Sequence, residues 1–193
     1  GFKSAGLPLQ IFSDVKADPP ISVISNAVRV AQEYGAGFIV GFGGGSSMDV
    51  AKLVALLALG KEKLADIYGV DMVKGPRLPL ILVPTTAGTG SEATKSSVVT
   101  VSESEKKGVL SPHLLPDLAL LDAELTLGLP PHVTAATGID AMVHAIEAFT
   151  TKRLKNPMAD CLAKEALRLL SGNLHKVVNA GNDIVARENM LLG

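Results

Sequence analysis

GFGGGSSMDVAK, residues 41–52, joins a short apolar run to a helix-like pattern through three consecutive glycines. A packed core does not call for glycines at 43–45, because each has no side chain to bury and loses much backbone entropy on folding. A strand, a glycine loop and a helix start together favour phosphate binding, since free N–H groups and the positive end of the helix dipole face the anion. The stretch therefore predicts a phosphate or dinucleotide site at this turn.

Details of the stretch limit that prediction. Ser46 can cap the new helix, and Asp49, three residues further on, fits a capping box. The pattern is not a P-loop, because no Gly-Lys-Ser or Gly-Lys-Thr closes it. Counted from Gly41, the third glycine of a G-x-G-x-x-G motif would fall on Ser46. A tight strand-to-helix turn without a ligand stays open as the alternative.

The composition describes a globular chain and excludes several classes of function. The chain has 193 residues, 47% of them hydrophobic and 4% aromatic, and a formal net charge of −1. It therefore has no basic field for nucleic acid, and it has no apolar run of the ~18 residues that a membrane helix needs. Its one cysteine, Cys161, lies in a helix-like stretch and is expected to be buried. The cysteine usage fits a cytoplasmic protein.

The order of apolar patterns predicts an α/β protein with two domains. Strands alternate with helices in the first part, which indicates a mostly parallel sheet. Residues 1–128 are predicted to form a parallel-sheet dinucleotide-binding domain, and residues 129–193 to begin an all-helical domain, because no strand pattern remains there. The predicted strands are 7–15, 38–42, 78–83, 98–101 and 118–121, and the predicted helices are 21–34, 46–59, 132–149, 157–170 (with 174–178 as its extension) and 184–192.

Both ends of the chain lead us to expect a fragment of a longer protein. Gly1 stands where a methionine is expected, within what looks like the end of a helix. The chain stops at Gly193 within apolar helical periodicity. We therefore expect the helical domain to be incomplete.

A second polar loop follows another buried strand. Thr85, Thr86, Thr89 and Ser91 crowd into seven residues directly after the apolar run 78–83. Ligands of open α/β sheets bind outside the carboxyl ends of the strands, where hydroxyl and free N–H groups can hold a ribose, an amide or a phosphate. A solvated loop of Ser/Thr turns is the alternative. Both loops are expected to open onto the same edge of the sheet.

The predicted helical part carries a pair of potential metal ligands. Asp140 and His144 are four residues apart, which places the carboxylate and the imidazole on one helical face. This pair of donors suits Fe²⁺ or Zn²⁺, although three or four protein ligands are usual. A simple ion pair on a helix is the alternative. The remaining histidines, His113, His132 and His175, are interpreted as surface or capping residues.

Taken together, these stretches resemble the iron-containing (group III) alcohol dehydrogenase family. Residues 43–52 and 84–92 are similar to its two cofactor loops, and residues 115–130 and 138–147 are similar to the crossing into its metal domain. The resemblance runs in order along essentially the whole chain. It implies a dinucleotide-binding domain and an all-helical domain with the active site in the cleft between them.

The resemblance also implies roles for individual residues. The cofactor, NAD or NADP, would be bound by Gly43, Gly44, Gly45, Ser46, Asp49, Thr85, Thr86, Thr89 and Lys106. Within that set, residues 44–46 would contact the pyrophosphate, the threonines would line the nicotinamide side and Lys106 would lie near the ribose. Asp140 and His144 would be the first two ligands of a catalytic Fe²⁺, with Zn²⁺ as the alternative. The family's two further ligand histidines lie downstream, so the fragment holds half of a metal site and can lack activity even where the full-length protein is active.

The implied function is hydride transfer between a small alcohol and NAD(P) by a metal-dependent oxidoreductase. The implied substrate is a small alcohol or aldehyde, and a homo-oligomer without nucleic-acid or membrane partners is expected. Other members of the superfamily, namely polyol (glycerol-type) dehydrogenases and dehydroquinate synthase-like enzymes, would share the loops. A non-catalytic nucleotide-binding or assembly module is the alternative from a different class.

Overall fold

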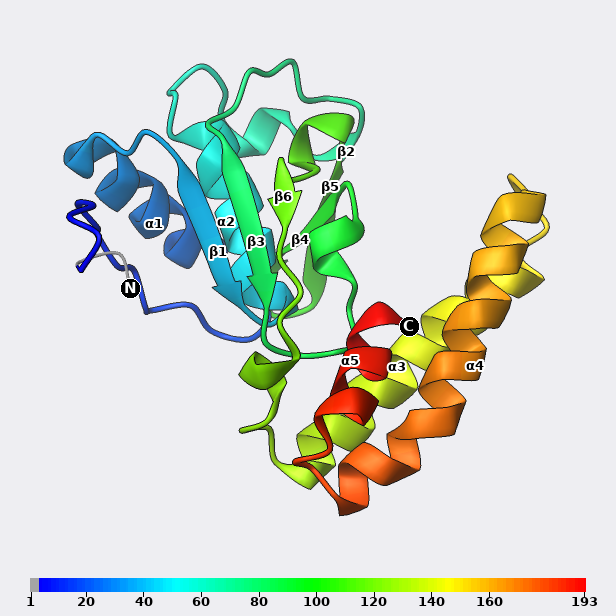
Figure 1. Cartoon of the computed structure of the whole chain (residues 1–193). Coiled ribbons are helices and arrows are strands. Elements are labelled where there is room, and N and C mark those ends of the chain that lie inside the picture. Colours follow the sequence, from blue (N-terminus) through cyan, green and yellow to red (C-terminus); the bar gives the residue numbers. More distant parts are fainter. Residues whose placement is uncertain (1–3) are drawn as a thin grey trace. The chain divides into compact units, whose positions relative to one another are not determined.

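The computed structural model describes residues 4–193 (Figure 1), so the helix end expected at Gly1 lies outside the described residues. The chain forms two compact units. The first unit contains residues 1–42, 46–82 and 91–119, and the second contains residues 43–45, 83–90 and 120–193. The domain boundary at residue 129 stays a prediction.

Two three-stranded sheets are built mainly from the first unit. The order is β1-β3-β6 in one sheet and β2-β5-β4 in the other. β3 and β6 are parallel, β2 and β5 are parallel, and β4 and β5 are antiparallel. β1 runs in the same direction as β3 (Figure 1). The strands are β1 (Ile39–Gly43), β2 (Gly69–Val70), β3 (Leu80–Pro84), β4 (Ser96–Ser102), β5 (Glu105–Leu110) and β6 (Leu118–Ala119).

Helix α2 (Gly45–Leu57) lies at the centre of the first unit and is buried nearly all round. One face packs Met48 and Ala55 against Leu80 and Leu82 of β3. The opposite face packs against α1 (Ile21–Tyr34) and against β4 and β5, in a cluster that contains Ile24, Ala27, Leu53, Leu56, Val99 and Val109. A helix that is apolar on every side is stable only when other elements cover it.

The predicted strands differ from the structure at three places: residues 7–15, β5 and β2, which is only two residues long and was not predicted. Residues 7–15 contain no strand, and Leu7, Leu9 and Ile11 are exposed. Their alternation resembles a half-buried strand, but no described strand pairs with the segment. Conversely, β5 was not predicted, because it begins with the charged residues Glu105, Lys106 and Lys107. It forms by pairing with β4, so the second sheet is mixed rather than parallel.

The second unit contains the helices α3 (Pro131–Thr150), α4 (Pro157–Asn179) and α5 (Ile184–Leu192), and no strand lies beyond residue 129, as predicted. α4 includes the expected extension at 174–178. The side chains of Asn156 and Asp183 cap α4 and α5 by accepting backbone N–H groups. The helices bury a common core made of Ala141, Leu170, Val177, Ala186 and Met190.

The prediction that Cys161 is buried is wrong. Cys161 is exposed, because it lies on the outer face of α4, beside Leu162, which is 65% exposed. The buried face of this turn is supplied by Ala163 instead. None of the described helices is both long enough and apolar enough to span a membrane.

Arg77 and Asp117 hold together the beginning of β3 and the segment before β6. The Arg77 guanidinium donates to the carbonyls of Leu78, His113 and Leu115 and, at 2.7 Å, to Asp117 Oδ2. The backbone N–H of Leu80 donates to the same carboxylate oxygen. The hydrogen bond from Arg77 holds the pKa of Asp117 below its ordinary value.

This geometry predicts a pH-dependent contribution to stability. A carboxylate whose pKa is lowered on folding stabilises the folded state at pH values above its unfolded pKa, and it loses that contribution as the pH falls through the folded value. We expect Asp117→Asn to lower the urea midpoint at pH 7, and we expect the gap to the unmodified protein to close as the pH falls below the ordinary value of 3.8. A gap of equal size at pH 7 and pH 3 would contradict this account.

Candidate functional site

Two loops follow the adjacent strands β1 and β3, and they touch one another. We call residues 43–45 the glycine loop and residues 83–90 the threonine loop. The backbone N–H of Thr85 donates to the carbonyl of Gly43 at 3.0 Å. A Cβ atom added at Gly45 would lie only 2.9 Å from the side chain of Thr89. The two loops are therefore in contact at the carboxyl ends of neighbouring strands, where α/β proteins bind ligands.

The three consecutive glycines have different reasons to be glycine. Gly43 has a φ of 144°, a conformation that side chains disfavour. Gly45 is crowded by Thr89. Neither reason applies to Gly44, where an added Cβ would lie at an ordinary distance of 3.4 Å from Thr86 Oγ1. Of the three glycines, Gly44 is therefore the one whose missing side chain is not explained by contacts within the protein.

The glycine loop opens directly into the first turn of α2, which begins at Gly45. The first N–H groups of a helix have no partner within the helix, and together with the helix dipole they favour an anion. The Asp49 carboxylate was expected to close a capping box. It instead accepts hydrogen bonds from Ser91 Oγ at 2.7 Å and from the backbone N–H of Val98 at 3.0 Å.

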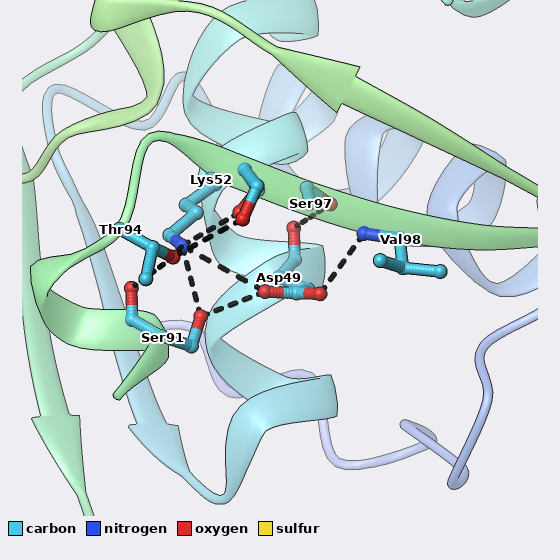
Figure 2. A network of polar contacts seen from close by, with 7 residues as sticks. Asp49, Lys52, Ser91, Thr94, Ser97 and Val98 are labelled. Carbon is cyan, nitrogen blue, oxygen red and sulfur yellow. Dashed lines mark hydrogen bonds and ion pairs between the residues drawn. The ribbon is translucent and has the colours of Figure 1, made fainter. Parts of the chain in front are cut away.

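A buried lysine beside Asp49 was not singled out from the sequence. Lys52 is fully buried. Its ammonium donates to Ser91 Oγ at 2.9 Å, Thr94 Oγ1 at 3.1 Å and the carbonyl of Ser96 at 2.8 Å (Figure 2). Asp49 Oδ1 lies 3.7 Å from the same ammonium. The sequence signal for a buried pair was that Lys52 follows Asp49 by three residues on a helix that is otherwise apolar on that side.

Burial and the neighbouring negative charges have opposite effects on the pKa of Lys52. Burial lowers the pKa of Lys52, and the negative charges of Asp49 and Glu92 counteract that effect. Burial also raises the pKa of Glu92. An ammonium with three acceptors and a nearby carboxylate has the partners that a buried cation needs.

The threonine loop also contacts the helix that carries the predicted metal ligands. A Cβ atom added at Gly88 would lie 2.8 Å from the backbone oxygen of Thr137 in α3. Ala87 packs against the core of the helical unit. Because Thr137 precedes Asp140 by one helical turn, this loop lies between the glycine loop and the part of α3 that carries Asp140.

Adding a methyl group at this contact is expected to destabilise the second unit. Gly88→Ala forces the loop backbone away from that of Thr137, and overpacking of this kind costs about 1–3 kcal/mol. Gly172→Ala is the matched control, because Gly172 lies within α4 and an added Cβ meets nothing within 4 Å. The control should stabilise the helix by roughly 0.5–1 kcal/mol. Urea denaturation of both variants checks the two opposite signs, and equal shifts would contradict the contact.

Asp140 and His144 form a pair on α3 that can hold a divalent metal. Asp140 Oδ1 lies 3.8 Å from His144 Nε2, and the two side chains are 47% and 51% exposed. Two ligand atoms at about 2.1 Å from one tetrahedral ion lie roughly 3.4 Å apart, so a small side-chain rotation brings both onto the ion. Within residues 4–193 no group of three or more His, Cys, Asp and Glu side chains gathers, so a closed site needs further donors.

The remaining predicted residues have simpler surroundings. Lys106 lies in β5 and pairs with Asp18 through an Nζ–Oδ1 distance of 2.6 Å, so its predicted place near a ribose stays a prediction. His113, His132 and His175 are exposed, which confirms that they are surface residues.

Comparison with known proteins defines the class of this fold. The structure of a 1,3-propanediol oxidoreductase matches with a TM-score of 0.93 and 35% identity, over 98% of this chain and 50% of that one. A sulfoacetaldehyde reductase from Bifidobacterium kashiwanohense in complex with NAD⁺ matches with a TM-score of 0.89 and 35% identity, over 97% of this chain and 50% of that one. The chain therefore shares its fold with about half of each of these two enzymes.

Sequence comparison then gives the family. The family model for iron-containing alcohol dehydrogenase matches residues 1–123, and the model for the C-terminal part of the Fe-containing alcohol dehydrogenase family matches residues 134–193. The chain belongs to the iron-containing alcohol dehydrogenase family. It is 44% identical to the probable alcohol dehydrogenase EutG of Salmonella typhimurium over 97% of this chain and 47% of that protein. The chain spans about half the length of the curated relatives it matches.

Proposed function

We propose that the full-length protein transfers a hydride reversibly between a small alcohol and NAD or NADP, with the help of a divalent metal. The observation that carries this proposal is the position of the threonine loop. Within one compact unit, it touches the glycine loop through Thr85 and Thr89 and touches α3 through Gly88. One short loop thus links the predicted nucleotide site to the helix of the predicted metal ligands.

The nucleotide would be held by backbone groups and hydroxyls. The N–H groups at the start of α2, including those of Gly45 and Ser46, would bind the pyrophosphate, because free helix N–H groups favour an anion. Thr85, Thr86 and Thr89 would orient the nicotinamide, and Lys106 would lie near the ribose. A structural relative in complex with NAD⁺ supports a nucleotide of this kind. Orientation of the nicotinamide is the main contribution that such loops make to hydride transfer.

Asp140 and His144 would hold the metal, Fe²⁺ or Zn²⁺. When bound, the metal supplies Lewis acidity that lowers the pKa of the alcohol oxygen. The protein's part is to present the carboxylate and the imidazole on one face of α3, half exposed and 3.8 Å apart. We further propose a cytoplasmic homo-oligomer.

The test is a nucleotide titration of the full-length protein combined with metal analysis and a substrate panel. NAD and NADP are titrated separately, and primary alcohols, glycerol and the matching aldehydes are assayed. We expect binding of at least one nucleotide, a stoichiometric divalent metal and oxidation of a small alcohol. Preference for glycerol would indicate the polyol branch of the superfamily. Binding without turnover of any substrate would favour a nucleotide-binding module, and absence of nucleotide binding would contradict the proposal.

A further inference from the structure

We infer that Lys52, Asp49 and Ser91 act together as positioning residues for the nucleotide, by fixing the glycine loop and the threonine loop relative to each other. We call these three residues the loop clamp. The inference rests on the proposed function, because it assumes that the two loops hold a nucleotide. The role does not require any clamp residue to touch the ligand.

The clamp joins the two loops at the points where the chain leaves them. Asp49 and Lys52 are the fifth and eighth residues of α2, the helix that begins at the last residue of the glycine loop. Ser91 directly follows Gly90, the last residue of the threonine loop, and begins a short 3-10 helix. In Figure 2 the side chains of all three residues point toward one another from these two segments. A shift of either segment would therefore break the contacts between them.

The hydrogen bonds of the clamp permit one arrangement of donors and acceptors. The ammonium of Lys52 has three N–H groups, and it donates to three acceptors at 2.8–3.1 Å. The hydroxyl of Ser91 donates a hydrogen bond to Asp49 Oδ1 at 2.7 Å, so a lone pair of Ser91 Oγ accepts from Lys52. The second carboxylate oxygen of Asp49 accepts a hydrogen bond from the backbone N–H of Val98. A network whose members are all satisfied is rigid and specifies a single geometry.

Stability alone does not call for a lysine at this position. Lys52 is fully buried, and replacing a buried ion pair by apolar residues of similar volume is often neutral or stabilising. Simple packing would be served by an apolar side chain, as at Leu53 and Leu56 on the same helix. Unlike an apolar side chain, the charged network fixes the distance between α2 and the segment after the threonine loop.

The test replaces Lys52 by a side chain of similar length without the charge. We expect Lys52→Met in the full-length protein to raise the nucleotide Kd at least about tenfold. The substitution removes the strong hydrogen bonds of a charged group, and these bonds fix the two loops that hold the nucleotide. NAD or NADP is used, whichever the unmodified protein binds. KM for the nucleotide should rise with Kd, and KM for the alcohol should change much less, since the clamp acts on the nucleotide loops.

Arg77→Met is the matched control. Arg77 also ties two segments of the first unit together through several hydrogen bonds, but it precedes β3, whereas the threonine loop follows that strand. A general loosening of the fold would raise the nucleotide Kd in both variants. The inference predicts a rise in Lys52→Met alone, at a comparable change in Tm.

A second pair of variants keeps the inference testable if Lys52→Met does not fold. Ser91→Ala removes the hydroxyl that links Lys52 to Asp49, whereas Ser91→Thr retains it. We expect the alanine variant to raise the nucleotide Kd and the threonine variant to restore most of the affinity.

The outcomes separate this inference from the proposed function. If the unmodified protein binds neither NAD nor NADP, the proposed function fails. If it binds one of them and Lys52→Met and Ser91→Ala bind it equally well, only the inference fails. An equal rise of Kd in Arg77→Met would likewise overturn the inference, because the effect would then be general.

Discussion

His144→Ala is expected to abolish both the bound metal and the oxidation of alcohol in the full-length protein. His144 is one of two predicted ligands, and the loss of an imidazole from a site of three or four donors leaves the metal weakly held. Lewis-acid assistance contributes several kcal/mol to reactions of this class, so kcat/KM should fall at least about a thousandfold. Metal analysis by mass spectrometry and steady-state kinetics measure the two losses.

The fold should survive this substitution. His144 is about half exposed and its nearest charged partner, Asp140, is 3.8 Å away, so its contribution to folding stability is small. His175→Ala is the matched control, because it removes an exposed imidazole from another helix of the same unit. The control should keep metal and activity. Unchanged metal content and turnover in His144→Ala would mean that Asp140 and His144 form only a surface ion pair and do not bind the metal.

Gly44→Ala is expected to weaken nucleotide binding strongly without destabilising the protein. An added Cβ at Gly44 meets no protein atom closer than 3.4 Å, so the fold can accept it. If the pyrophosphate lies against this backbone, the same Cβ displaces it from the N–H groups at the start of α2. Loss of two hydrogen bonds to a charged group corresponds to a rise of Kd on the order of a hundredfold.

Gly45→Ala provides the contrast that makes the result informative. A Cβ atom at Gly45 would lie 2.9 Å from Thr89, so this variant should lose stability as well as affinity. Thermal unfolding and nucleotide titration of both variants therefore separate crowding between the loops from contact with a ligand. Nucleotide binding by Gly44→Ala with unchanged affinity would place the pyrophosphate elsewhere.

Two of the helices could be predicted from the sequence to the residue. The helices at 21–34 and 184–192 have the predicted bounds, because the left-handed Gly35 ends the first and the side chain of Asp183 caps the second. Whether the segments 7–15 and 105–110 form strands could not be judged in this way. A strand exists only through its partner, and the partner of β5 is β4, whereas the alternating segment 7–15 has none among the described residues.

The features of the candidate site likewise divide into those visible in local sequence patterns and those that depend on tertiary contacts. The family, the glycine and threonine loops and the spacing of Asp140 and His144 could be recognised in the sequence, because each depends on residue types at short separations along the chain. The folded structure was needed to show that the two loops touch, that Gly88 contacts α3 and that Lys52 is buried against Ser91. These contacts join residues that are distant in sequence, and their existence depends on how strands pair and helices pack rather than on any local pattern.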